Sequence, residues 1–454
     1  MSKNSREPVE VPQVDTKFRR IKTALPVPES MELIEKLEKY EPNSMSGQQP
    51  VIWDKAKGIQ VYDKWGNKWL DWSSGVLIAN TGHAHPDIIK SLQEVINSEL
   101  ISTYVFYHEK RAELVELLQR YAPEGLDKVF LLSTGSEATE NSIKLARTYG
   151  IEKGGKEKNV IVSFNNAFHG RTLGAQLAGG IPALKKWIVN KDPDFINVPF
   201  PDGYYEKDQS FDLFLESLKE QGINPKNIAG VIVESYQGAG PFFLPNKYAK
   251  KLEAFCREND ALLIMDEVQS GFGRTGKWFA FEHYDVKPDL IACGKGISSS
   301  LPISAVIGRD DVMNMYPPGS MTSTHSSSPL PVVAAIANIN ALKNEKMTEN
   351  AAELGKVLKE GLEKIQAKHS DKITHVTSEG LVAGMQVGNP DFTKEDGEIA
   401  LLINERCFQK GLLMFTPVGP GGRCIKIAPP LVTTLEALVE GLSVLEEVCD
   451  EVLK

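Results

Sequence analysis

Short apolar runs alternate with helix-like patterns through the middle of the chain, between about residue 85 and residue 344. Several of these runs are apolar on both faces, which is typical of strands covered by helices on either side of a mostly parallel sheet. The pattern therefore predicts one large α/β domain over residues 85–344. Its strands are expected at 129–132, 160–162, 230–233, 262–265, 290–292 and 303–306, and its helices include 137–149 and 247–258.

The two ends of the chain carry different patterns. The first 45 or so residues are polar and proline-rich, with a short helix expected at 29–39, and residues 53–70 alternate around Trp65-Gly66-Asn67 like a hairpin. Beyond residue 345, the pattern predicts helices at 348–367, 399–408 and 435–448 and strands near Val382 and Ile425. We expect a smaller α+β domain that combines residues 1–84, an arm and hairpin, with residues 345–454.

Composition narrows the functional classes. The 454 residues carry 51 basic and 60 acidic side chains, a net charge of −9, which argues against a domain that binds nucleic acid or an anionic membrane surface. The chain has no run of about 18 apolar residues, so no transmembrane helix is expected, and its polar N-terminus does not resemble a secretory signal. Five scattered cysteines without Cys-x-x-Cys spacing predict free thiols in the cytoplasm, with neither zinc nor disulfides.

Three loops follow predicted strands, at the sheet edge where open α/β sheets bind ligands. Gly135 and Ser136 open a helix and could cradle a phosphate, although a plain helix cap explains them equally well. Asp266 ends an apolar strand and could cap a helix, form an ion pair or face a cationic ring nitrogen. Lys295 stands between two glycines; inside a pocket its amine would be a nucleophile for carbonyls, and in solvent it would be an ordinary loop lysine.

Two other motifs favour simpler interpretations. Residues 271–276 match the G-x-G-x-x-G fingerprint of dinucleotide sites, but that motif must join a strand directly to a helix, and residues 267–270 intervene here. His83-Ala84-His85 offers two metal ligands without a suitably spaced third. We expect a loop there, followed by a helix that begins at Pro86.

The three loops together match the needs of one cofactor. Pyridoxal 5′-phosphate has a phosphate, a ring nitrogen and an aldehyde to anchor, and a phosphate cradle, an acid and a lysine follow one another along the chain. Longer motifs agree: Asp266-Glu267-Val268-Gln269-Ser270-Gly271-Phe272-Gly273-Arg274-Thr275-Gly276, Thr134-Gly135-Ser136-Glu137-Ala138 and Phe168-His169-Gly170-Arg171. From about residue 35 onward, the sequence resembles the class III (ω-) aminotransferases, fold-type I pyridoxal-phosphate enzymes that include 4-aminobutyrate and ornithine aminotransferases.

The resemblance implies roles for individual residues. Lys295 would hold the cofactor as an internal aldimine and then carry the proton between substrate and cofactor, while Asp266 would pair with the pyridinium nitrogen. Thr324 would reach the phosphate from a partner subunit, which implies a homodimer with a shared active site. The remaining cofactor-binding residues would be Gly135, Ser136, Phe168, His169, Val268 and Gln269.

The substrate side of the implied site departs from the family pattern. Glu234 stands in Glu-Ser-Tyr-Gln-Gly instead of Glu-Pro-x-Gln-Gly, and in many members of the family this Glu pairs with an Arg that binds the keto-acid carboxylate. Here Lys426 occupies the Arg position and Arg423 lies three residues earlier, so on a strand only one of them should enter the pocket. Val76 is a candidate for the pocket wall, and Ser298-Ser299-Ser300 replaces the usual glycines after the lysine.

The activity implied by the resemblance is a ping-pong transfer of an amino group from an ω-amine or amino-acid donor to a keto acid, either 2-oxoglutarate or pyruvate. The donor stays open among 4-aminobutyrate, ornithine, acetylornithine, diamines and β-amino acids. Racemases or epimerases, aminomutases and a decarboxylase of the same family are alternatives, and a nicotinamide-dependent dehydrogenase that uses residues 271–276 is a distant one.

Overall fold

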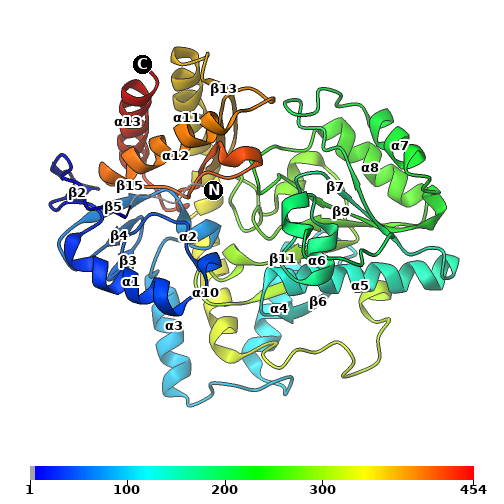
Figure 1. The fold of residues 1–454 in the computed structure, drawn as a ribbon. Helices are drawn as coiled ribbons and strands as arrows, with labels where there is room; N and C mark the ends of the chain where they lie inside the picture. Colours follow the sequence, from blue (N-terminus) through cyan, green and yellow to red (C-terminus); the bar gives the residue numbers. More distant parts are fainter. Residues whose placement is uncertain (1–5) are drawn as a thin grey trace. The chain divides into compact units, whose positions relative to one another are not determined.

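The computed structural model describes residues 6–454, which divide into two compact units. The large unit is Pro86–Thr348, and the small unit combines the residues up to His85 with Glu349–Lys454. Figure 1 traces the chain from blue at the N-terminus to red at the C-terminus. The large unit is therefore one continuous segment, whereas the small unit takes both ends of the chain.

A seven-stranded sheet forms the centre of the large unit (Figure 1). Neighbouring strands pair in parallel, except that β12 is antiparallel to both β11 and β6. The strands from β12 to β7 are buried along their whole length, as runs that are apolar on both faces require. The strand order is β6 (Lys128–Leu132), β12 (Ser304–Gly308), β11 (Leu290–Cys293), β10 (Leu262–Asp266), β9 (Ile228–Glu234), β7 (Val160–Phe164) and β8 (Phe195–Val198).

Helices complete the large unit. α5 (Gly135–Gly154) packs on β9, β11 and β12, and α8 (Asn246–Glu258) packs on β10. α10 (Pro329–Asn344) lies against α3 (Pro86–Asn97) and α4 (Glu109–Tyr121). The expected α/β fold with a mostly parallel, helix-covered sheet is confirmed. The other helices of this unit are α6 (Leu173–Ala178), α7 (Phe211–Glu220) and α9 (Asp310–Met313).

Two local features differ from the sequence pattern. β8 was not expected, because this edge strand is only partly buried and its Asn197 interrupts the apolar run. In the small unit, residues 53–70 form three strands instead of one hairpin, since Gly58, with φ of 57°, makes a second turn between β3 and β4.

The small unit contains two sheets. The first has the order β1 (Val14–Asp15), β2 (Arg20–Ile21), β5 (Lys68–Asp71), β4 (Gln60–Tyr62) and β3 (Lys55–Lys57), with β15 (Leu412–Leu413) parallel to β5. The second is antiparallel, with the order β13 (Ile373–Glu379), β14 (Val382–Val387) and β16 (Cys424–Ile427). The helices are α1 (Met31–Tyr40), α2 (Ser74–Leu77), α12 (Lys394–Gln409), α13 (Leu435–Val452) and nearly all of α11 (Met347–Lys368).

α2 is a left-handed turn. All four of its residues have positive φ, from 48° at Ser74 to 69° at Val76, although Gly75 alone lacks a Cβ that opposes this conformation. The Ser74 hydroxyl donates to Ala428 O at 2.6 Å, and the Ser73 hydroxyl accepts a hydrogen bond from Gly75 N. Tertiary hydrogen bonds therefore hold a conformation that the local sequence disfavours.

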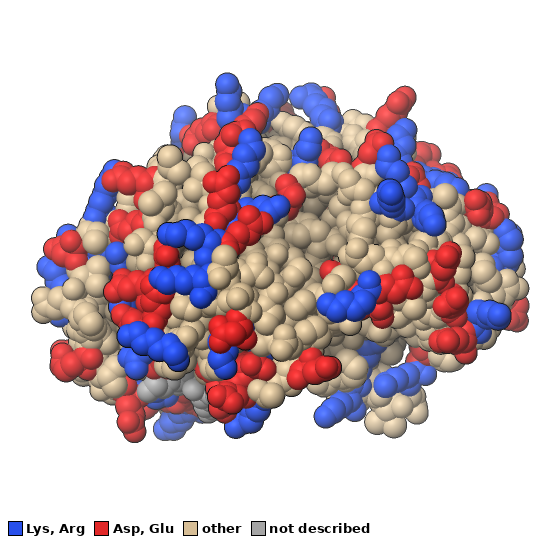
Figure 2. Space-filling view, turned by 90° about the horizontal axis from the view of Figure 1, so that it is seen from above, with Lys and Arg blue, Asp and Glu red and all other residues tan. Residues whose placement is uncertain are grey.

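Basic and acidic side chains are interspersed over the face shown in Figure 2. Such a surface fits the net charge of −9 and differs from the continuous basic patch of a nucleic-acid-binding protein. None of the helices within residues 6–454 combines the length and the apolar character needed to cross a bilayer. The five cysteines are buried free thiols.

Candidate active site

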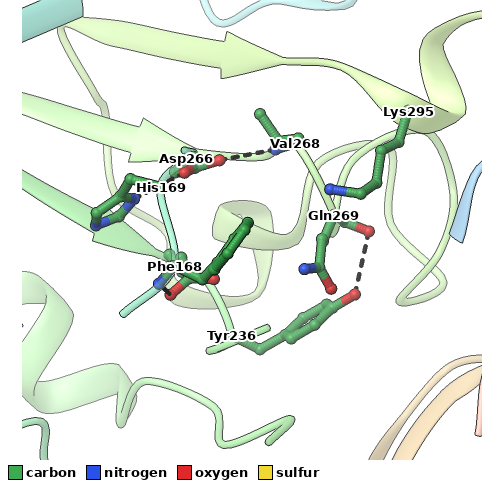
Figure 3. Close-up of a pocket in the computed structure, with 9 residues that line it drawn as sticks. Phe168, His169, Tyr236, Asp266, Val268, Gln269 and Lys295 are labelled. Atoms are coloured by element: carbon green, nitrogen blue, oxygen red, sulfur yellow. Dashed lines mark hydrogen bonds and ion pairs between the residues drawn. The ribbon is translucent and has the colours of Figure 1, made fainter. Parts of the chain in front are cut away.

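A cavity of about 330 Å³, counting the space open to solvent, lies where β9, β10 and β11 end. Its lining belongs entirely to the large unit, and it is found at the carboxyl edge of the sheet where α/β proteins bind ligands. Figure 3 shows the side chains that face this cavity. The lining residues are Phe168, His169, Gly170, Glu234, Tyr236, Asp266, Val268, Gln269 and Lys295.

Asp266 is the last residue of β10 and is held firmly. Its Oδ2 lies 2.8 Å from Nδ1 of His169, and its Oδ1 accepts a hydrogen bond from Val268 N at 3.0 Å. Both side chains are nearly inaccessible, with residue exposures of 4% for Asp266 and 3% for His169. Burial, the largest single effect, opposes a charge on His169, but the hydrogen bond to Asp266 and the negative charges of Asp266 and Glu234 together outweigh it and raise the pKa of His169. The acid thus keeps a fixed orientation beside the cavity.

Lys295 begins a short 3₁₀ helix, Lys295–Ile297, directly after β11 and Gly294. Its φ of 43° lies in the left-handed region, which is uncommon for a residue with a side chain. Burial lowers the pKa of its amine, while the negative charges of Asp266 and Glu234 partly counteract this effect. A lysine in this setting keeps more of its amine in the neutral, nucleophilic form than a solvated lysine does.

Glu234 ends β9, and its carboxylate is bound by main-chain donors. Phe168 N donates to Oε2 at 3.0 Å and Gly238 N donates to Oε1 at 2.8 Å. Burial raises the pKa of Glu234 to about 7, with a contribution from Asp266, whereas His169 and the two main-chain donors act in the opposite direction. This residue was predicted on the substrate side, yet it lines the same cavity as the predicted cofactor residues.

Tyr236 is a lining residue that the sequence interpretation did not assign. Its hydroxyl donates to Gln269 O at 3.1 Å, and Figure 3 shows the ring below Gln269. A Cβ at Gly238 would come within 2.3 Å of the Gln269 amide nitrogen, so the Gln269 side chain rests on bare main chain. The available signal was position alone, because Tyr236 follows the end of β9 by two residues.

Gly135 and Ser136, at the start of α5, adjoin the cavity. A Cβ at Gly135 would lie 2.6 Å from Val268 Cγ1, and one at Gly170 would lie 2.5 Å from Ser136 Oγ. Thr134 caps α5 by accepting a hydrogen bond from Glu137 N, and Ser136 Oγ accepts one from Arg171 N at 3.2 Å. The 20-residue helix therefore directs its positive end and its main-chain N–H groups at this place, which suits an anion.

Four residues that the sequence predicted for the site do not line this cavity. Thr324 is exposed on the loop that precedes α10 and is not among the lining residues. Val76, in the left-handed turn of the small unit, is 36% exposed. In the same unit, Arg423 is fully buried; its Nη1 donates to Val387 O and Gly388 O, and its guanidinium lies 5.0 Å from the Phe392 ring. Lys426 is 3% exposed and pairs with Gly384 across the β14–β16 ladder.

The two motifs given simpler interpretations lie in loops. Residues 271–276 form consecutive turns after β10, with neither strand nor helix beside them, so they lack the geometry of a dinucleotide site. His83 Nε2 lies 2.7 Å from Asp71 Oδ2, and α3 begins at Pro86 as expected.

Comparison with known proteins finds one matching family and several similar aminotransferases. Residues 43–449 match the family model described as aminotransferase class-III. An acetylornithine aminotransferase of Caldanaerobacter subterraneus is 32% identical over 89% of this chain and 95% of its own length. A probable 4-aminobutyrate aminotransferase of Bacillus subtilis is also 32% identical, over 86% of this chain and 91% of its own. An ornithine aminotransferase structure from Toxoplasma gondii, described with partial occupancy of PLP at its active site, superposes with a TM-score of 0.82 at 27% identity, covering 94% of this chain and 96% of its own.

Proposed function

This chain belongs to the class-III aminotransferase family, and we propose that it transfers amino groups with pyridoxal 5′-phosphate bound in the cavity of Lys295 and Asp266. The relatives named above carry aminotransferase names, which leaves the racemase, epimerase, aminomutase and decarboxylase alternatives without support. The turn geometry of residues 271–276 argues against a nicotinamide-dependent dehydrogenase.

The observation that carries the proposal is that one cavity contains both an acid held at a strand end and a partly buried amine. Beside it lies the N-terminus of α5, where Gly135 leaves no Cβ between the helix start and Val268. These groups suit the three anchoring points of the cofactor: its ring nitrogen, its aldehyde and its phosphate. Phe168 and Val268 would cover the two ring faces, and Gln269 would approach the phenolic oxygen.

When bound, the cofactor supplies an aldehyde for covalent attachment and a cationic ring that accepts electrons from the substrate carbon. The protein residues orient the cofactor and place charges beside it. Asp266 places a carboxylate, oriented by His169 and Val268 N, where a ring N–H can donate to it. Its negative charge favours the protonated ring nitrogen, and electrostatic stabilisation of this kind is commonly the largest contribution to rate.

Lys295 has two tasks in this proposal. Its Nζ attacks a carbonyl carbon when neutral, which the lowered pKa favours. Once the substrate amine has displaced Lys295, the same Nζ takes a proton from the substrate carbon as general base. It later donates a proton as general acid. Both tasks need the amine inside the cavity that Asp266 and Glu234 also line, and the charges of these two residues partly restore its pKa.

Spectroscopy of the two half-reactions tests the proposal. The purified protein should show the yellow absorbance of lysine-bound cofactor, lose it with an amino donor alone, and regain it with a keto acid. Lys295→Ala should remove both the absorbance and the reaction, whereas Lys277→Ala, at an exposed position, should change neither. Full activity of Lys295→Ala would refute the assigned role, and a reaction that needs no keto acid would refute transamination.

We further propose that Lys426 binds the carboxylate of the keto acid or amino-acid substrate. Arg423 is already engaged, since its Nη1 donates to two main-chain carbonyls and its guanidinium packs on Phe392. Lys426→Met should therefore raise KM for keto acids about tenfold or more. Arg423→Met should instead lower the thermal midpoint and leave KM unchanged. The reverse outcome would assign the carboxylate to Arg423.

A homodimer is the proposed assembly, with Thr324 reaching the phosphate of the partner's cofactor. The large unit exposes a run of apolar side chains at the end of α3 and in the segment that follows it, with Phe106 76% and Tyr107 97% exposed. The run consists of Ile96, Leu100, Ile101, Tyr104, Phe106 and Tyr107. Exposed apolar side chains gathered in one segment are typical of an interface, and a second copy would cover them.

Mixed dimers test whether the site is shared. Thr324→Val should weaken cofactor binding in the pure variant. A hybrid of Thr324→Val with Lys295→Ala contains one site with an intact lysine and the partner's intact threonine, so tight binding should return at that site. A monomer in solution, or a hybrid without recovery, would contradict the shared site.

A further inference from the structure

The turn that carries Lys295 contains two residues in an unfavourable main-chain conformation. Lys295 has φ of 43° and Ser299 has φ of 53°, both in the left-handed region that a Cβ disfavours. The 3₁₀ helix Lys295–Ile297, which begins at the first of these two residues, is a single short turn and contributes little stability of its own. Something outside the turn must hold it.

Asn338 supplies that support from α10. Its Nδ2 donates to Gly296 O at 2.8 Å and to Ile297 O at 2.9 Å, and its Oδ1 accepts a hydrogen bond from the Ser299 hydroxyl. The carbonyl oxygens can only accept, so the amide nitrogen must be the atom that faces them. One side chain thus binds both carbonyls that follow Lys295 and the second strained residue.

The position of Asn338 is unusual for an amide. The residue is fully buried, and the other buried members of α10 are proline or apolar: Pro329, Val332, Val333, Ala334, Ala335, Ile336, Ala337, Ile339, Ala341 and Leu342. A polar group in such surroundings is unfavourable unless its hydrogen bonds are made. All the hydrogen bonds described above go to the turn 296–299, so the amide and the turn stabilise each other.

We propose that Asn338 and Ser299 are a pair of positioning residues that hold the Lys295 turn and thereby set where its amine lies relative to Asp266 and Glu234. This inference rests on the proposed function of Lys295. Asn338 binds the main chain within two residues of Lys295, so its loss would let φ of Lys295 relax toward an ordinary value. The amine would then move, and a displacement of about 1 Å at a reacting group can slow a reaction about 100-fold.

Two substitutions at Ser299 separate the effect of its hydroxyl from the effect of its main-chain conformation. Ser299→Ala keeps the unfavourable φ and loses the hydroxyl, whereas Ser299→Gly loses the hydroxyl and removes the steric cost of the conformation. The glycine variant should therefore resemble the parent and the alanine variant should be impaired. Asn338→Asp keeps an acceptor for Ser299 and loses the donors to Gly296 O and Ile297 O. It therefore tests the hydrogen bonds to these two carbonyls separately from the hydrogen bond to Ser299.

The experiment measures the holoenzyme in three ways: the pH midpoint of the lysine-bound cofactor absorbance, the rate at which apoprotein regains that absorbance with pyridoxal phosphate, and the thermal midpoint. Asn338→Asp and Ser299→Ala should shift the absorbance midpoint by about half a pH unit or more and slow reconstitution about tenfold. Matched controls are Asn340→Asp on the exposed side of α10 and Ser300→Ala at the exposed end of the turn. A residue that only stabilises α10 would lower the thermal midpoint without moving the absorbance midpoint.

Two outcomes overturn the inference: variants of Asn338 and Ser299 that titrate and reconstitute like their controls, or Ser299→Gly that is as impaired as Ser299→Ala. Where Asn338→Asp does not fold, the two Ser299 variants decide. Failure of the proposed function looks different, because the parent protein itself would then show no absorbance that depends on Lys295.

Discussion

Replacing Glu234 with Gln should change how the stability of the protein depends on pH. Glu234 is only 5% exposed, and its two carboxylate oxygens accept hydrogen bonds from Phe168 N and Gly238 N. Burial is the largest cause of the rise of its pKa from 4.5 to about 7, and the nearby Asp266 adds to it. Gln has nearly the same shape and cannot ionise.

The size of the expected change in stability follows from the pKa shift of Glu234. A rise from 4.5 to about 7 corresponds to about 3 kcal/mol between the folded and unfolded states. Because the folded state holds the proton more tightly, the contribution of Glu234 to stability is fully present below about pH 4.5 and is lost as the pH rises through about 7. The Gln variant has no such loss. Its unfolding free energy relative to the parent should therefore increase by about 3 kcal/mol from about pH 4.5 to about pH 9.

Urea unfolding at constant ionic strength, repeated across this pH range, measures the difference directly. A constant offset is expected as well, because the Gln amide group presents one donor to a main-chain N–H that formerly had an acceptor. The prediction concerns only the change with pH. Glu152→Gln, at an exposed position on α5, is the matched control. A difference between Glu234→Gln and the parent that stays within about 1 kcal/mol over the whole range would refute the reasoning.

Three more substitutions have defined outcomes. Asp266→Asn keeps the size of the side chain and removes its charge, so stopped-flow measurement of the donor half-reaction should show a rate about 100- to 1000-fold lower; an unchanged rate would contradict the role of the charge. Val76→Gly relieves a left-handed conformation at a β-branched residue and should raise the unfolding free energy by about 1 kcal/mol, seen as a higher thermal midpoint; a lower midpoint would mean that the turn is not strained. Gly135→Ala introduces a Cβ 2.6 Å from Val268 Cγ1 and should weaken binding of pyridoxal phosphate about tenfold in equilibrium dialysis, whereas unchanged affinity would show that α5 can shift without cost.

The sequence predicted the parts of the fold that depend on local pattern. β10 and β11 are apolar up to their last residues, Asp266 and Cys293, so the sequence alone assigns the acid and the lysine to one sheet edge. β8 was missed because an edge strand is half exposed and lacks that pattern. The roles of the cavity residues remain predictions until the variants are measured.

The sequence did not predict the side-chain orientations and turn conformations that depend on contacts between distant segments. The orientation of Asp266 comes from His169, 97 residues away in the chain, and the left-handed turn at Ser74 is held by Ala428, 354 residues away. Asn338 looks like an interruption in an apolar helix until its contacts with the Lys295 turn are known. Intrinsic preference opposes the turn residues, and tertiary hydrogen bonding overrides it.

The antiparallel strand β12 limits how the lysine region can change during evolution. β11 and β12 are joined by the Lys295 turn, and their ladder fixes Cys293 opposite Ala305 at its mouth. A parallel neighbour would need a long crossover with room for inserted residues. Here residues 294–303 alone connect the two strands, and a residue added next to Lys295 would disturb the hydrogen bonds that hold its turn. Changes in substrate range should therefore accumulate in segments outside this hairpin, and libraries made to alter specificity should keep its length constant while varying the surrounding loops.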